Sequence, residues 1–153
     1  MNDMENKAYV FGMIFLLSNK LQILGDKMDP CLTVKQWFFL AGVLRCESNT
    51  PTLSELGAKI GSSRQNVKKI ASLLEKQGFV LMEKDPEDGR VVRIRLTDAC
   101  VEYLKQREEM EDRFIEELFE NFRPEDISFL SEMFQRLEGN VNEMGLKYDE
   151  RKA

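Results

Sequence analysis

The chain has 153 residues, of which 42% are hydrophobic and 32% are charged, and its formal net charge is −5. These values are typical of one soluble globular domain with a core of its own. The sequence has no histidine, which excludes Ser-His and Cys-His nucleophile pairs and histidine metal sites. Its three cysteines, Cys31, Cys46 and Cys100, form no Cys-x-x-Cys pair, which argues against a zinc cluster or a disulfide framework. We therefore expect a cytoplasmic protein that is not an enzyme and that has no metal or other cofactor.

The charged side chains are unevenly distributed along the chain. Residues 1–51 carry five basic and five acidic side chains, residues 52–97 carry nine and six, and residues 98–153 carry eight and sixteen. A basic segment between neutral and acidic flanks is typical of a module that binds a polyanion. The excess is small, and a chance imbalance on solvated surfaces would also produce it.

Residues 6–24 are predicted to form the first helix, because apolar residues recur there at helical spacing. The segment resembles the apolar part of a signal sequence, but its leader lacks a positive region, and no apolar run reaches the ~18 residues of a membrane helix. We interpret it as a buried helix and expect no membrane association. Gly25 and Pro30 predict a break. Thr33 and Gln36 then form a capping box for a second helix, VKQWFFLAGVLRC, which is apolar nearly all round and therefore central in the core.

Residues 52–78 predict two short helices in direct succession. Thr52 and Glu55 form a capping box for the first helix, and Gly61 is a natural stop. Ser62, together with Gln65, is predicted to cap the second helix, which ends near residue 78. Two helices joined by a tight turn form a helix-turn-helix, whose second helix usually enters the major groove of DNA.

The outer face of that second helix has side chains suited to DNA. Serine hydroxyls at a helix N-terminus can bind phosphates. Arginine can read guanine, and glutamine or asparagine can read adenine. Lysines can neutralise phosphates, which predicts steeply salt-dependent binding. The candidate DNA-binding residues are Ser62, Ser63, Arg64, Gln65, Asn66, Lys68 and Lys69. An ordinary helical hairpin with a solvated face is the alternative.

Residues 79–97 are predicted to form a β-ribbon, with strands VLMEK and RVVRIRL around the turn DPEDG. In the second strand apolar residues alternate with arginines, so one face of the ribbon is apolar and the other is mostly cationic. A helix-turn-helix followed by such a ribbon is a winged helix, and a cationic wing can enter the minor groove. We identify Arg90 and Arg93 as candidate DNA contacts. Asp88 and Gly89 are interpreted as structural residues of the wing, with Asp88 holding a nearby arginine, because phosphate repels a carboxylate.

Two long helices complete the chain, one capped by Thr97 and running to about Phe122, and one opened by Pro124. The predicted fold is therefore mainly α-helical with a small β-ribbon. Residues 33–97 form the winged helix, and helices 6–24 and 98–145 flank it. Because the terminal helices have large apolar faces, which need a partner, we expect them to form a homodimer. Packing of these helices on each other in a monomer is the alternative.

The motifs of residues 52–97 resemble those of the MarR family of bacterial transcription regulators. The sequence TLSELGAKIGSSRQNVKKIASLLEKQGFV is similar to that family's helix-turn-helix. The sequence DGRVVRIRLT resembles its wing signature, in which Asp-x-Arg is followed six residues later by Leu-Thr, here Asp88, Arg90, Leu96 and Thr97. The helix before the motif and the two helices after it also follow the family's order, so the resemblance covers nearly the whole chain.

The resemblance implies an obligate homodimer that binds a pseudo-palindromic operator in double-stranded DNA. Such regulators usually repress, often their own operon, and are released by a small ligand or by oxidation. The family's ligand pockets lie where the dimerisation helices meet the winged lobe, which makes Met13, Trp37, Phe38 and Phe39 candidate walls of a site for a small aromatic or lipophilic effector. Ordinary core packing is the alternative for each.

Two further functions stay open at this point. Cys31 lies beside a helix N-terminus, which could lower its pKa and make it a redox sensor, although structural filling is the alternative. The second open function is that of a winged-helix module that binds a protein instead of DNA. The polar, cationic face of residues 62–72 disfavours that module, because protein interfaces prefer apolar and aromatic anchors.

Overall fold

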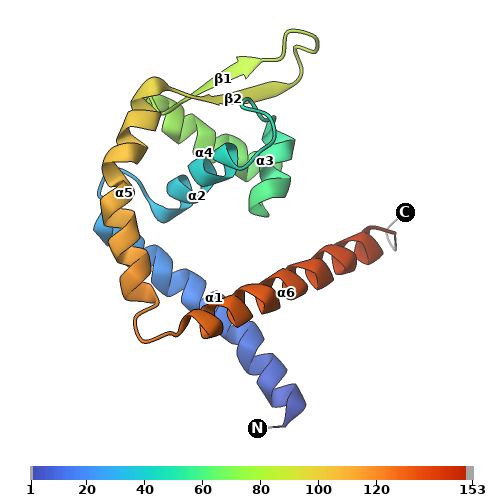
Figure 1. Ribbon diagram of the computed structural model, residues 1–153. Helices are drawn as coiled ribbons and strands as arrows, with labels where there is room; N and C mark the ends of the chain where they lie inside the picture. Colours follow the sequence, from blue (N-terminus) through green and yellow to red (C-terminus); the bar gives the residue numbers. More distant parts are fainter. Residues whose placement is uncertain (1, 151–153) are drawn as a thin grey trace. The chain divides into compact units, whose positions relative to one another are not determined.

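The computed structural model describes residues 2–150, which form six helices and one two-stranded sheet (Figure 1). The predicted fold class, mainly α-helical with a small β-ribbon, is confirmed. In chain order the elements are α1 (Asp3–Met28), α2 (Val34–Leu44), α3 (Leu53–Ile60), α4 (Arg64–Lys76), β1 (Val80–Lys84), β2 (Val92–Leu96), α5 (Asp98–Leu118) and α6 (Pro124–Glu150).

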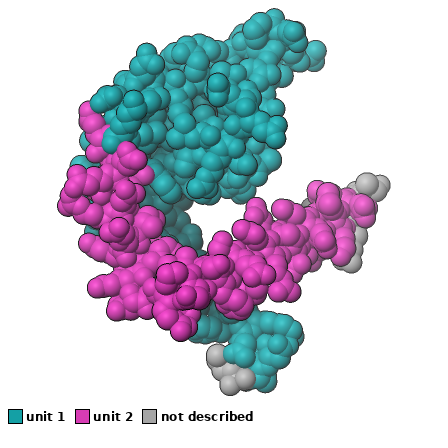
Figure 2. Space-filling model, in the orientation of Figure 1, with its two compact units in different colours: residues 1–105 teal, residues 106–153 magenta. Residues whose placement is uncertain are grey.

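The chain divides into two compact units, Met1–Lys105 and Gln106–Ala153 (Figure 2). The boundary falls within α5. The first unit therefore contains α1 to α4, the ribbon and the start of α5, and the second contains the rest of α5 and α6.

Helix α2 lies in the centre of the hydrophobic core of the first unit, as its apolar sequence predicted. Phe39 and Leu40 are fully buried, and residues from α3, α4 and both strands complete the same core. Helix α3 packs closely on Gly42, where a Cβ atom would lie 2.4 Å from a methyl carbon of Ile60. Helix α2 thus forms the support on which the helix-turn-helix rests.

Two of the three predicted capping boxes are confirmed, at Thr33–Gln36 and Thr52–Glu55. The third prediction was wrong by one residue. Ser63, not Ser62, caps α4 by accepting from the backbone N–H of Asn66 at 3.2 Å. The Ser62 hydroxyl instead accepts from the Asn66 side-chain amide at 2.7 Å, and the Ser62 backbone N–H donates to the carbonyl of Gly57 at 2.8 Å, which closes the end of α3.

Helix α1 is longer than predicted, because Gly25 does not break it. A Cβ atom on Gly25 would lie 2.1 Å from a methyl carbon of Val34, so this glycine permits close packing of α1 on α2. The helix is also not buried, since Gly25 is its only buried residue in the described chain. By length and composition α1 could cross a membrane, contrary to the expectation from its longest apolar run. Helix α1 therefore exposes a large apolar surface.

The second unit consists of helical segments with few buried residues. Helix α5 ends at Leu118 and does not continue to about Phe122, because the chain turns at Asn121, whose φ is 68°. Pro124 opens α6 at its first position, as predicted. No residue of α6 is buried.

Candidate nucleic-acid interface

The exposed side of α4 and the two serines before it carry seven of the nine residues that the sequence identified for DNA. Its apolar positions, Val67, Ala71 and Leu74, are buried in the core. This spacing leaves the polar side chains of the first two turns in solvent. We call the following residues the recognition face; all are exposed except Ser62, which is half-buried: Ser62, Ser63, Arg64, Gln65, Asn66, Lys68 and Lys69.

The recognition face has a net positive charge, supplied by Arg64, Lys68 and Lys69. Within residues 2–150, the structure shows no ion pair for Arg64, Lys68 or Lys69. At the start of the helix, the Asn66 side-chain amide donates to the Ser62 hydroxyl at 2.7 Å, and Ser63 forms the cap. Two side-chain hydrogen bonds thus fix the start of the helix, and the exposed cations that follow are available to a polyanion.

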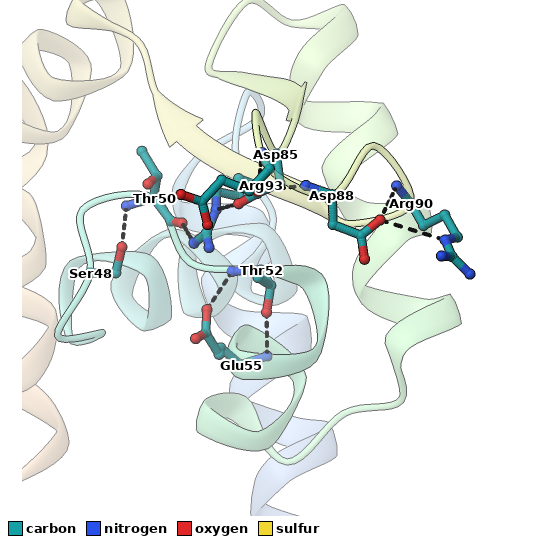
Figure 3. A network of polar contacts seen from close by, with 9 residues as sticks. Ser48, Thr50, Thr52, Glu55, Asp85, Asp88, Arg90 and Arg93 are labelled. Atoms are coloured by element: carbon teal, nitrogen blue, oxygen red, sulfur yellow. Dashed lines mark hydrogen bonds and ion pairs between the residues drawn. The ribbon is translucent and has the colours of Figure 1, made fainter.

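Arg90 projects from the tip of the wing between β1 and β2. Its side chain is 95% exposed, with Nε 3.6 Å from Asp88 Oδ1. The same Asp88 oxygen accepts from the Arg90 backbone N–H at 3.0 Å (Figure 3). Asp88 thus orders the tip without occupying the whole guanidinium.

The turn at the wing tip is shaped by carboxylates more than by its glycine. Asp85 Oδ1 accepts from the backbone N–H groups of Glu87, at 2.8 Å, and Asp88, at 3.1 Å. A Cβ atom on Gly89 would meet nothing within 4 Å. Its φ is not among the positive values in the chain. A side chain would therefore fit at Gly89, which the sequence had identified as structural.

Arg93 does not lie free on an outer cationic surface, as the sequence had suggested. Its Nε donates to Asp85 Oδ2, and its Nη1 donates to the carbonyl oxygen of Thr50 at 3.0 Å (Figure 3). The Arg93 hydrogen bond, followed by the two backbone N–H groups of the turn, lowers the pKa of Asp85. Asp85 in turn raises the pKa of Arg93. The Arg93 guanidinium is therefore engaged within the lobe.

The outer face of the ribbon is neutral, not mostly cationic. In the antiparallel register Leu81 pairs with Arg95 and Glu83 with Arg93. Each arginine reaches a carboxylate two residues beyond its paired residue, and the Arg95–Glu83 pair has an Nη2–Oε1 distance of 2.9 Å. Such diagonal neighbours lie on one face of a sheet. Residues 79–97 contain four basic and four acidic side chains. The carboxylates of the first strand and the turn therefore cancel the positive charge of the second strand.

An open hollow of about 330 Å³ lies between the start of α3, the start of α4 and the wing. Arg64 and Arg90 both line it. The other lining residues are Thr52, Leu53, Ser54, Val91 and Val92. The fold thus brings a cation of the helix and a cation of the wing to one surface.

The four residues predicted to line an effector site do not line this hollow. Phe39 is part of the hydrophobic core, and Trp37 packs against that core. Phe38 is exposed, and Met13 is half-buried on α1. For Phe39, core packing is therefore the correct interpretation.

The three thiols have different environments. Burial raises the pKa of Cys100 to about 11 and also raises the pKa of Cys46. Cys31 is exposed; its backbone N–H donates to Asp29, and its carbonyl accepts from Gln77 of the α4 cap. In the described residues, no three His, Cys, Asp or Glu side chains are placed to hold a metal ion.

Comparisons with known proteins connect this geometry to a family. The sequence profile of the MarR family matches residues 32–92, which contain α2, the helix-turn-helix and the wing tip. The transcriptional regulator YdgJ of Bacillus subtilis is 25% identical over 130 residues, which is 85% of this chain and 79% of YdgJ. The transcriptional repressor MprA of Escherichia coli is 29% identical over 92 residues, 59% of this chain and about half (52%) of MprA.

The fold also matches a solved regulator. The organohalide-sensing regulator RdhR, solved in its 2,4-dichlorophenol-bound form, superposes with a TM-score of 0.77 at 19% identity. The match covers 92% of this chain and 85% of RdhR. At that identity the match establishes the winged architecture.

Proposed function

We propose that this chain, which belongs to the MarR family of transcription regulators, binds a specific operator in double-stranded DNA as a homodimer in the cytoplasm and represses transcription. Like the family, it is a regulator and not an enzyme. One observation carries the proposal: the cations of the recognition face are exposed and form no ion pair with any residue in the described range 2–150, and one of them, Arg64, shares a hollow with Arg90 of the wing.

Each part of this surface has a distinct proposed role. Arg64 and Gln65, in the first turn of α4, read base edges in the major groove, where arginine pairs with guanine and glutamine with adenine. Lys68 and Lys69, one turn further on, bind phosphates. Arg90 follows the minor groove beside them, which attracts a guanidinium where it is narrow.

The homodimer is inferred from apolar helix surfaces that each unit exposes by itself. Monomeric soluble proteins rarely expose contiguous apolar patches of more than a few hundred Å². Exposed large apolar residues of α1 include Tyr9, Val10, Phe11, Phe15, Ile23 and Leu24, and those of α6 include Phe129, Phe134, Val141, Met144 and Leu146. A second copy that covered them would place two recognition helices on half-sites about one helical turn apart.

Repression and release by an effector are supported by the relatives. MprA is a transcriptional repressor, and RdhR has been solved with a small aromatic phenol. We propose that a small aromatic or lipophilic effector binds this chain too, with Met13, Trp37 and Phe38 as candidate contacts. These three differ from Phe39 in being half-buried or exposed and therefore accessible.

Selection of binding sites from random duplexes tests the function and requires no assumption about the operator sequence. We expect enrichment of a pseudo-palindrome with half-sites about 10 base pairs apart. By fluorescence anisotropy, this site should bind about 10³-fold more tightly than a random duplex at physiological salt. The control is an Arg64→Ala/Lys68→Ala double variant, which should enrich nothing. No enrichment and no binding at low salt with the wild-type chain would favour the protein-interaction module instead.

A further inference from the structure

We infer that Arg93 is a positioning residue that fixes the wing to the loop before α3, so that Arg90 meets DNA while Arg93 does not. The consequence for DNA binding rests on the proposed function, whereas the anchoring itself does not. Arg93 thus has a role different from that of Arg90, although the sequence makes both of them candidate DNA contacts.

The Arg93 guanidinium joins two segments that are far apart in the sequence. Its Nε donates to Asp85, which directly follows β1, and its Nη1 donates to the carbonyl oxygen of Thr50, which precedes α3. Asp85 uses its second oxygen to hold the backbone of the wing turn. A continuous chain of hydrogen bonds therefore runs from the wing turn through Asp85 and Arg93 to Thr50.

Backbone contacts lie at the same junction. The N–H of Ile94 donates to the carbonyl of Pro51 at 2.9 Å, and Thr52 forms an antiparallel bridge with Arg93. Thr52 is also the N-cap of α3, held by its capping box with Glu55 (Figure 3). These contacts hold the wing beside Thr52, the N-cap of the first helix of the helix-turn-helix. The Arg93 side chain adds a further hydrogen bond at the same junction.

Burial separates Arg93 from the other arginines of the wing. In the Arg93–Asp85 pair the side chains are 33% and 12% exposed, whereas in the Arg95–Glu83 pair they are 47% and 49% exposed. Turning Arg93 toward a phosphate would break two hydrogen bonds and leave a partly buried carboxylate unpaired, which is costly. The Arg95–Glu83 pair joins the same two strands by bonds that stay within the ribbon, and so serves as a matched control.

Asp85→Asn gives opposite expectations for the two roles of Arg93. Asparagine is isosteric and can still accept from the turn through its side-chain oxygen, but it loses the charge that holds Arg93. If Arg93 contacted phosphate, freeing it and removing a negative charge would tighten DNA binding. If Arg93 positions the wing, the same change weakens binding.

The experiment compares the wild type with Arg93→Ala, Arg93→Lys, Asp85→Asn, Arg95→Ala and Glu83→Gln. Without DNA, hydrogen–deuterium exchange of residues 50–52 and 85–94 should speed up in the Asp85 and Arg93 variants and stay unchanged around residues 50–52 in the Arg95 and Glu83 variants. Arg93→Lys keeps the charge and tests the anchor if the alanine variant folds poorly, since an ammonium cannot reproduce the guanidinium fork.

Operator binding over a salt series gives the second readout. Arg93→Ala, Arg93→Lys and Asp85→Asn should each weaken binding about tenfold, equivalent to about 1.4 kcal/mol, at every salt concentration. The slope of log affinity against log salt should not change in the Arg93 variants. A slope reduced by about 0.9 in Arg93→Ala, or tighter binding by Asp85→Asn, would make Arg93 a phosphate contact. Unchanged exchange in all three variants would overturn the anchor even if DNA binds, and failure of the wild type to bind any DNA would refute the proposed function alone.

Discussion

Gly57 and Ser62 are in such close contact that no side chain fits between them: a Cβ atom on Gly57 would lie 2.7 Å from the carbonyl oxygen of Ser62. The backbone of Ser62 also returns a hydrogen bond to the Gly57 carbonyl. At Gly61 the situation is different, because its φ of 66° favours glycine but a Cβ atom there would meet open space. The tight turn between α3 and α4 therefore depends on two glycines for two physical reasons.

Gly57→Ala should destabilise the protein more than Gly61→Ala. The Gly61 change should cost about 1–2 kcal/mol, the usual penalty of a left-handed conformation for a residue with a side chain. The Gly57 change requires the backbone of the turn to move, and so should also reduce DNA binding. Urea unfolding of both variants measures the difference, and an equal or smaller effect at Gly57 would contradict the close contact.

Substitutions on the DNA surface should separate base reading from phosphate binding. Arg64→Ala or Gln65→Ala should weaken operator binding and relax base preference at one position of each half-site, by about 1–3 kcal/mol for Arg64. Lys68→Ala should lower affinity for all duplexes and reduce the salt slope by about 1. Arg90→Ala should weaken binding across sequences. Anisotropy with operator and random duplexes tests this, and equal losses on both duplexes for the Arg64 and Gln65 variants, as expected for Arg90→Ala, would contradict the assigned division of roles.

Acid should loosen the wing through Asp85. Its pKa is lowered in the folded state by Arg93 and the turn N–H groups. The pair therefore contributes its stability above the unfolded-state pKa of about 3.9, and this contribution is lost as the pH falls through the lower, folded pKa. Unfolding free energies measured from pH 5 downward should fall less steeply in Asp85→Asn than in the wild type. Parallel curves would show that the pair does not contribute to stability.

A charge on the apolar surface of α6 should dissociate the dimer. Phe134 is exposed in the single chain, and Phe134→Glu would bury a charge without a partner in the proposed interface, which costs several kcal/mol. Sedimentation velocity at micromolar concentration should show a monomer, and Gln135→Glu, which adds the same charge at a polar position of the same helix, should stay dimeric. A wild-type protein that sediments as a monomer would refute the dimer.

The apolar surface of α1 has a competing explanation that the same preparation can test. A helix of this length and composition can also enter a bilayer. We expect the wild-type protein not to co-sediment with phosphatidylcholine vesicles, because in the proposed dimer the second copy covers its apolar surface. Co-sedimentation would mean that α1 binds lipid.

Thiol labelling should be confined to one residue at neutral pH. Burial raises the pKa of Cys100 to about 11, and that of Cys46 is raised too, so both are protonated and poorly nucleophilic. Iodoacetamide at pH 7.5 should therefore modify Cys31, the exposed cysteine. Peptide mass spectrometry measures the sites, and modification of Cys100 in the folded protein would contradict its buried position. Loss of DNA binding on oxidation, retained by Cys31→Ser, would establish the redox alternative.

The sequence predicted those elements that local rules determine. The capping boxes at Thr33 and Thr52 and the stop at Gly61 each depend on residues within one turn of helix, and the structure has all three. The cap of α4 was displaced because two adjacent serines, each followed three residues later by an amide side chain, give equivalent local patterns. The choice depends on the length of the turn between α3 and α4, in which both Gly61 and Ser62 lie before the cap.

Two predictions, a cationic face of the wing and a buried α1, were wrong for a different reason. Each depends on contacts with residues outside the segment from which the prediction was made. The neutrality of the ribbon depends on strand register, which sets Glu83 and Asp85 beside the arginines of β2. The sequence did contain one indication of these ion pairs. Asp85 directly follows the first strand, and the second strand contains Arg93 and Arg95. The exposure of α1 similarly depends on contacts with other parts of the protein, which the apolar pattern of the helix alone does not specify.

The junction of β2 with Pro51 and Thr52 has a practical consequence for engineering. The same three residues, 50–52, receive the wing and start α3, so the wing is not an independent module that ends at its own turn. A chimaera that exchanges only residues 80–96 would pair a foreign strand, and the foreign residue at position 93, with the native backbone of residues 50–52. Transplanting residues 50–52 together with the ribbon keeps donor and acceptor from the same parent, and this sets the boundaries at which such regulators can be recombined.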